Sequence, residues 1–172
     1  MRVNLYDIGG SMTNLLSKSC CKKLPLIPHM GVRIYGREYF FSNRIESRAS
    51  SGMDMMLPPE KVSSISFDFG ITNRSIESIN GWLDEASQRY NRKTYNLWNR
   101  NCNHFAEEFS AFLLPELGIP AAILDPILDV TESMLDSVPS WRRSIGETFM
   151  NDISRIVLMC WGAIVKDEKK LR

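Results

Sequence analysis

Cysteine and histidine are scarce in this chain, which has four cysteines and two histidines among its 172 residues. Cys20 and Cys21 are adjacent, and the other cysteines and histidines lack the paired spacing of a zinc site. The sequence therefore predicts no disulfide framework, no metal and no cofactor. Such cysteine usage favours a reducing compartment, so we expect the protein in the cytoplasm, with the nucleus as an alternative.

Long apolar runs and an excess of charge are also absent. No run reaches the length needed to cross a bilayer, and residues 1–7 resemble neither a signal peptide nor a myristoylation site. The formal net charge is +1, so we expect no nucleic-acid partner. The chain also lacks repeats and low-complexity tracts. What remains is an ordinary globular composition and a length that fits one domain with an appendage.

Periodic apolar residues divide the chain into an early part with strands and a later part with helices. Alternation predicts strands at residues 3–6, 30–35, 37–41 and 61–67, with a turn at Gly36 and an irregular loop at 46–60. Three- and four-residue spacing predicts helices from Thr72 or Asn73 to Tyr90, and at 101–113, 121–137 and about 140–166. In the first helix the side chains expected to face inward are Ile76, Ile79, Trp82, Leu83 and Ala86. The predicted fold class is α+β, a small antiparallel sheet packed on helices.

Cys102 lies between two asparagines where a helical pattern begins. Asn101 can cap this helix, which places Cys102 in the first turn, where free N–H groups and the helix dipole lower thiol pKa values. The Cys102 N–H is then a natural oxyanion donor, and Asn101 or Asn103 could add a side-chain amide or serve only as caps. The alternative interpretation is a buried, inert cysteine.

A cysteine nucleophile needs a base, most often histidine. His104 follows Cys102 by two positions, so on a helix the two point to different sides, and we expect His104 to be a polar or capping residue. His29 begins a strand and can project toward a helix N-terminus, which makes it the candidate base. A hairpin about Gly36 would place residues 42–44 opposite His29, so Asn43 is a candidate for orienting its ring.

Four segments of the chain together resemble the PPPDE family, papain-like cysteine peptidases with permuted order that include the desumoylating isopeptidases. The segments are 3–7, 29–41, 95–105 and 118–120. The resemblance covers about residues 1–125 and leaves 126–172 as a C-terminal helical extension. It implies a permuted papain-like fold and a Cys102–His29 dyad. For some relatives it also implies a homodimer with the active site in a groove at the interface.

The implied reaction is cleavage after the C-terminal glycine of a ubiquitin-like modifier, SUMO or ubiquitin, attached to a protein. A narrow groove near Gly31 would suit a diglycine tail, because glycine allows close backbone approach. Tyr35 is the second residue that we assign to this groove.

Two other functions stay open. The lecithin retinol acyltransferase group has a similar strand histidine and a box like residues 101–105, which would imply lipid acyl transfer or thioester hydrolysis such as protein depalmitoylation. The run at 36–41 favours the peptidase. A catalytically silent module that binds a modifier is the second alternative. The apolar stripe at 140–166 fits core or partner contacts better than a membrane surface.

Overall fold

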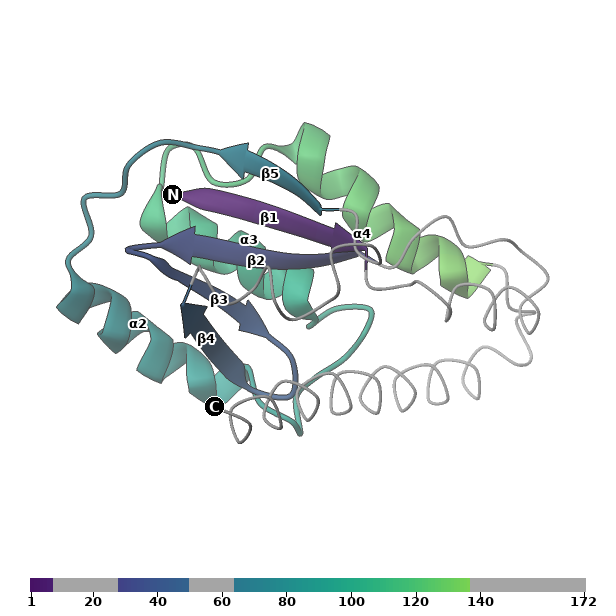
Figure 1. Cartoon of the computed structure of the whole chain (residues 1–172). Helices are drawn as coiled ribbons and strands as arrows, with labels where there is room; N and C mark the ends of the chain where they lie inside the picture. The colour runs from purple at the N-terminus through teal and green to yellow at the C-terminus, as the bar shows by residue number, and fades with distance from the viewer. Residues whose placement is uncertain (8–27, 50–63, 137–172) are drawn as a thin grey trace, which may run out of the picture.

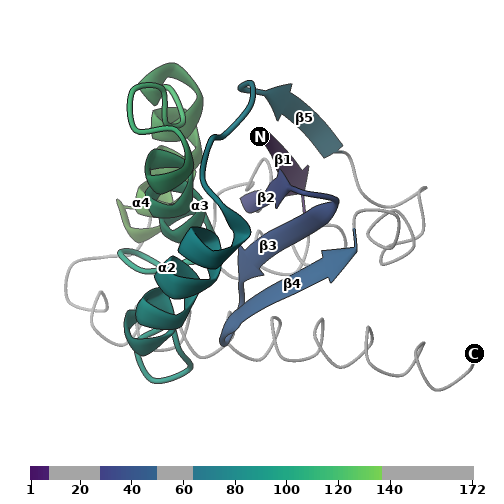
Figure 2. The ribbon, with the colours of Figure 1, turned by 90° about the vertical axis from the view of Figure 1, so that its left-hand side faces the viewer.

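A five-stranded antiparallel sheet with three helices on one side forms the part of the chain that the computed structural model describes, residues 1–7, 28–49 and 64–136 (Figures 1 and 2). The sheet order is β4-β3-β2-β1-β5. The strands are β1 Arg2–Asp7, β2 Pro28–Ile34, β3 Arg37–Phe41, β4 Ile45–Ala49 and β5 Ser64–Asp68; the helices are α2 Ile76–Arg89, α3 Cys102–Leu113 and α4 Ala121–Asp136. This confirms the predicted α+β class. The helix predicted at about 140–166 lies outside the described residues.

The β2–β3 hairpin turns at Tyr35 and Gly36, with φ values of 46° and 70°. Two consecutive positive φ angles are those of a type I′ turn, whose twist matches that of the flanking strands. The turn sets the pairing of Val32 with Tyr39 and of Ile34 with Arg37. This is the register predicted from Gly36.

The hydrophobic core lies between the sheet and α3. Successive side chains of a strand point to opposite faces, and in β2 the residues Met30, Val32 and Ile34 join the buried apolar cluster on the helix side. On α3, Phe105 and Phe109 are fully buried in the same cluster. Their four-residue spacing puts them on one helix face, as predicted. This packing fixes where α3 starts relative to β2.

β4 occupies Ile45–Ala49, and all of it after Ile45 falls in the stretch 46–60 predicted to be an irregular loop. It pairs along its whole length with β3 and forms one edge of the sheet. The strand was missed because Glu46, Ser47 and Arg48 give it no apolar alternation. Polar and charged residues are common in edge strands, where they discourage pairing with other chains. Residues 50–60 of the predicted loop lie outside the described residues.

α2 begins at Ile76, later than predicted. Its N-cap is Ser75, whose hydroxyl accepts from the Ser78 N–H at 3.2 Å. Thr72 was a predicted cap, but its hydroxyl donates to the Leu113 carbonyl at 2.8 Å and so ties this loop to α3. Ile76 is 58% exposed, so its predicted inward position is wrong. Ile79 and Ala86 are buried, and Trp82 and Leu83 pack against the core.

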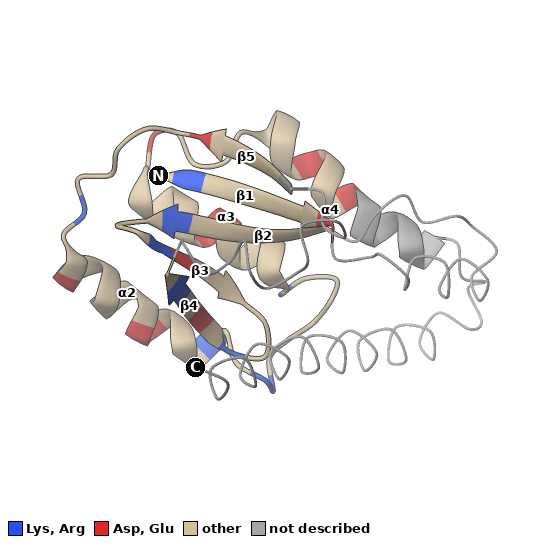
Figure 3. Ribbon diagram, viewed as in Figure 1, with Lys and Arg blue, Asp and Glu red and all other residues tan. Residues whose placement is uncertain are grey.

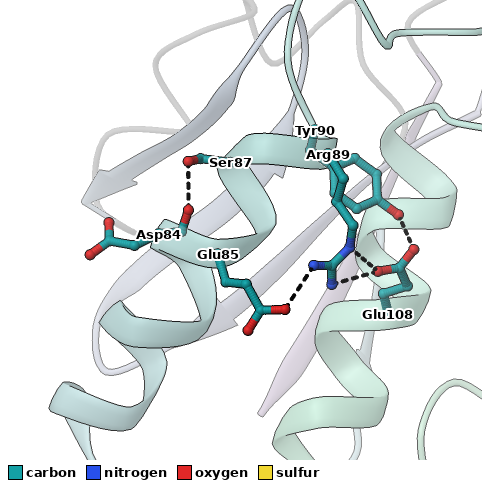
Figure 4. A network of polar contacts seen from close by, with 6 residues as sticks. All are labelled: Asp84, Glu85, Ser87, Arg89, Tyr90 and Glu108. Atoms are coloured by element: carbon teal, nitrogen blue, oxygen red, sulfur yellow. Dashed lines mark hydrogen bonds and ion pairs between the residues drawn. The ribbon is translucent and has the colours of Figure 1, made fainter.

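A polar contact joins the end of α2 to α3 (Figure 4). Glu108 accepts from the Tyr90 hydroxyl at 2.5 Å and from Arg89 at 3.0 Å, and Arg89 also reaches Glu85 on its own helix. Burial and the bond to Glu108 raise the pKa of the Tyr90 phenol. Elsewhere, charges of both signs are spread over the described elements, in keeping with the small net charge (Figure 3).

Pro115, Gly118 and Pro120 lie in the connection between α3 and α4, which separates the two helices predicted at 101–113 and 121–137. α4 follows and packs Leu124 and Ile127 into the core. The predicted boundary between residues 125 and 126 falls within α4, and the division into two parts stays a prediction. Among the described residues, no helix is both long and apolar enough to span a membrane.

Candidate active site

The first turn of α3 is held by a reciprocal cap. The Asn101 side-chain oxygen accepts from the N–H groups of Asn103 at 2.8 Å and His104 at 3.2 Å, and the Asn101 N–H donates to the His104 ring at 3.4 Å. The Asn101 amide donates to the Leu97 carbonyl at 2.7 Å. The capping roles predicted for Asn101 and His104 are confirmed. An oxyanion role for Asn101 stays a prediction, and its amide is already engaged in holding the loop.

The start of α3 meets β2 at the edge where the ladder with β3 has ended. The backbone groups of Pro28, Met30 and Val32 point to the same edge, because residues two apart in a strand do so. Val32 pairs with Tyr39, the last pair of that ladder. Beyond it, the Asn103 amide donates to the Pro28 carbonyl at 3.4 Å, and the Met30 N–H lies close enough to the Cys102 sulfur to act on the thiol pKa. The first turn of α3 thus replaces a neighbouring strand.

This contact brings the thiol to the residue that follows His29. The thiol also donates to the Asn103 side-chain oxygen at 3.6 Å. His29 is fully buried, and its side chain points to the face of the sheet that lies away from α3. Its ring lies 5.7 Å from that of Phe40 and 6.4 Å from that of Tyr6, between centroids.

The electrostatics of both groups are governed by burial. Cys102 is 5% exposed, and burial raises its thiol pKa to about 12, although N–H groups of Met30, Cys102 and Asn103 act to lower it. Burial, and then the positive charge of Arg48, lower the His29 pKa to about 4. The lowered thiol pKa expected at a helix start is therefore wrong here, because desolvation outweighs the helix amides. At pH 7 both groups are neutral.

The three weaker site predictions fare differently. The described β2–β3 ladder ends before it reaches Asn43, which lies in the turn to β4, so its role toward His29 stays a prediction. At Gly31 an added Cβ would lie 2.2 Å from a carboxylate oxygen of Glu38. The group that approaches the Gly31 backbone closely is therefore the Glu38 side chain of this chain. Tyr35 lies about 20 Å along β2 from His29, and its hydroxyl donates to the Arg74 carbonyl. A groove through both would follow the whole strand.

Several polar residues on the His29 face were not predicted from the sequence. Glu38 is 1% exposed, and the Tyr6 hydroxyl donates to its carboxylate, with distances of 3.0 and 3.2 Å to the two oxygens. Arg48 is its ladder partner on β4. One feature of the sequence could have indicated Glu38. In the hairpin register, Glu38 and Gly31 fall on the same face of neighbouring strands, so the Glu38 side chain has room to lie over the glycine.

A cavity of about 470 Å³ opens at the other end of α3, lined in part by Ile71, Arg74 and Leu117. It lies about 17 Å along the helix axis from Cys102. It is therefore separate from the Cys102 region. Within the described residues, no cluster of three or more acidic, histidine or cysteine side chains is arranged to hold a metal.

Comparison with known proteins adds a family and named relatives. The family model described as "PPPDE putative peptidase domain" matches residues 1–138. Desumoylating isopeptidase 1 of Rattus norvegicus is 28% identical over 127 residues, 73% of each chain. The proteins of the same name from Homo sapiens and Xenopus laevis are 26% and 25% identical over 147 residues, covering 80% of this chain and 85% of theirs.

Proposed function

Because the chain belongs to the PPPDE peptidase family, we propose that it is a cysteine isopeptidase that cleaves SUMO from lysine side chains of proteins. The family and the names of its relatives support a peptidase or isopeptidase role. The choice of SUMO over ubiquitin rests on those names. We also propose a permuted papain-like arrangement, in which the strand histidine precedes the helix cysteine, and a reducing compartment that keeps the thiol free.

One observation carries the assignment of residues: the Asn103 amide donates to the Pro28 carbonyl, which brings Cys102 to the segment of β2 that holds His29. An asparagine cap and a strand edge hold the first turn of α3, which carries the Cys102 sulfur. We assign Cys102 as the nucleophile and His29 as the base.

The neutral state of both groups determines the first step. His29 takes the proton from the Cys102 thiol as the sulfur attacks the carbonyl carbon of the glycine–lysine isopeptide bond. The Cys102 N–H, which the Asn101 cap leaves unused, donates to the oxyanion. The lysine amine leaves with the proton from His29. Water, deprotonated by His29, then attacks the thioester carbonyl, and the Cys102 sulfur leaves and takes that proton back from His29.

The burial of both groups implies that substrate binding changes their environment. A neutral thiol with a pKa near 12 is a weak nucleophile, so attack depends on proton transfer to His29 rather than on a preformed thiolate. The glycine tail of the modifier would need to reach the β2 edge at which Cys102 lies. Gly31 and Tyr35 remain candidates for guiding that tail, with Gly31 the nearer to Cys102.

The test is hydrolysis of a SUMO–lysine isopeptide conjugate by Cys102→Ala and His29→Gln, with His104→Gln as the matched control. The first two variants should lower kcat/KM by about a thousandfold or more. His104→Gln should retain activity, since glutamine at this helix position can also complete the cap. Full activity in either of the first two variants would refute the dyad.

Two further substrates and one reactive probe distinguish the proposed function from its alternatives. A ubiquitin conjugate tests the modifier, and a palmitoyl-cysteine peptide tests thioester hydrolysis. A SUMO probe with an electrophilic C-terminus should become attached to Cys102. Binding of SUMO without attachment or cleavage would instead indicate a silent binding module.

A further inference from the structure

A line of hydrogen bonds crosses the sheet on the face that carries His29. The Ser66 hydroxyl donates to the Asn4 side-chain oxygen at 2.7 Å, and the Asn4 amide donates to the Tyr6 hydroxyl at 3.1 Å. Tyr6 in turn donates to Glu38. These residues come from β5, β1 and β3, so the line passes over β2 without a side chain from it.

Gly31 makes this crossing possible. It lies on β2 between Tyr6 on β1 and Glu38 on β3, and any Cβ there would collide with the Glu38 carboxylate. A buried carboxylate costs several kcal/mol unless it is paired, so its position is compensated by specific partners. Those partners are the Tyr6 hydroxyl and the charge of Arg48, which faces Glu38 across the β3–β4 ladder.

Both members of this oppositely charged pair hold a ring that flanks His29. Glu38 accepts from Tyr6, whose ring lies 6.4 Å from the imidazole. The Arg48 guanidinium lies over Phe40 at 4.9 Å, and Phe40 presents its ring at 71° to the imidazole at 5.7 Å. The imidazole is therefore flanked by two aromatic rings, each fixed by a different charge.

We propose that Tyr6 and Glu38 are positioning residues for His29. Glu38 anchors the Tyr6 hydroxyl, and the anchored Tyr6 ring, with Phe40 on the other side, holds the imidazole in one orientation. The consequence for catalysis rests on the proposed function; the consequence for the ring orientation does not. Among the described residues, the titratable and charged groups on this face of the sheet include Tyr6 on β1, Arg33 on β2, Glu38 on β3, and Glu46 and Arg48 on β4.

The variants are Tyr6→Phe, which keeps the ring and removes the anchor, and Glu38→Gln, which keeps the shape and removes the charge. Nitrogen NMR of histidine-labelled full-length protein reports the His29 tautomer and pKa directly. The chain has only two histidines, so His104→Gln assigns the signals and the His104 signal is an internal reference. Both variants should shift the His29 tautomer equilibrium and leave the His104 signal in place.

Hydrolysis of the SUMO–lysine conjugate is the second readout. Loss of orientation should lower kcat by about 10- to 100-fold with little change in KM. The double variant should be no worse than either single variant, because Glu38 acts through the Tyr6 hydroxyl. Tyr6→Leu, which also removes the ring, should be worse than Tyr6→Phe. Asp68→Asn, at an exposed ion pair with Arg2 on the same sheet, is the control and should behave as the parent protein.

The outcomes distinguish the two proposals. If His29→Gln abolishes hydrolysis but Tyr6→Phe and Glu38→Gln change neither kcat nor the His29 signals, the positioning role is wrong and the dyad stands. If His29→Gln retains hydrolysis, the dyad is wrong, and the NMR signals still decide the positioning role. Thermal unfolding of each variant shows whether a loss of activity reflects a loss of folding; a folded variant with unchanged His29 signals overturns the proposal.

Discussion

The two faces of β2 are both buried, but side chains of opposite character fill them. Met30 and Val32 point toward α3 and join the hydrophobic core cluster. His29 points the other way, into a region where a carboxylate, a phenol and a guanidinium meet aromatic rings. Burial therefore does not by itself identify the hydrophobic core of this protein. Mutations on the helix face should cost stability, and mutations on the other face should also disturb His29.

The strongest test of this contrast replaces one buried phenylalanine on each face by alanine. Phe109→Ala removes a fully buried ring from the helix side, so the free energy of unfolding should fall by about 3–5 kcal/mol. The His29 NMR signals should not move. Phe40→Ala should also destabilise the protein, but it should shift those signals. Denaturant unfolding and the histidine spectra measure both effects; a shift of His29 in the Phe109 variant alone would break the contrast.

The polar face should also give stability a dependence on pH. The His29 pKa is lowered from 6.5 to about 4 on folding, so between these values the unfolded chain binds the proton and the folded protein does not. The contribution is full above about pH 6.5 and falls by about 3 kcal/mol as the pH drops to 4. Unfolding of the parent and His29→Gln at pH 4 to 7 should show this difference. Parallel curves would contradict a buried, neutral His29.

A smaller effect is expected for the polar contact on the helix side. Glu108→Ala leaves the Tyr90 hydroxyl without its acceptor, so stability should fall by about 1–2 kcal/mol. Glu85→Ala removes only an exposed pair within α2 and should cost about 0.5 kcal/mol or less. Thermal unfolding of the two variants gives the comparison. Equal losses would show that the link between the helices adds nothing beyond a surface ion pair.

The smallest effect concerns the far end of β2. Tyr35 has a positive φ, which asparagine tolerates better, so Tyr35→Asn should stabilise the hairpin by up to about 1 kcal/mol. The rate of Cys102 alkylation by iodoacetamide should stay that of the parent, because Tyr35 lies at the opposite end of the strand. A lower rate would place Tyr35 in the Cys102 site after all.

Most of the fold could be predicted because local signals agreed with tertiary packing. The β2–β3 register follows from one turn residue, Gly36, and the start of α3 follows from one capping residue, Asn101. β4 could not be predicted, since an edge strand is stabilised by its neighbour rather than by its own apolar pattern. The start of α2 was misplaced because Thr72 bonds to a distant helix, a contact that local sequence does not reveal.

The site was less predictable than the fold. Residue spacing alone was enough to set His104 aside as a base. The sequence does not show how deeply a side chain is buried. The pKa of Cys102 was therefore expected to fall, although burial raises it. Glu38 was missed for the same reason. A glutamate in a strand is expected to face solvent unless its partners on neighbouring strands are known.

The fit of Glu38 over Gly31 should be visible in the evolutionary record of related chains. An added Cβ at position 31 would lie 2.9 Å from the Glu38 carboxyl carbon as well as in contact with its oxygen. A side chain at 31 therefore demands a shorter residue at 38, which could no longer reach Tyr6. The two positions should change together rather than singly. In a related chain, a glycine two residues after the strand histidine then identifies the acidic residue on the next strand as its partner.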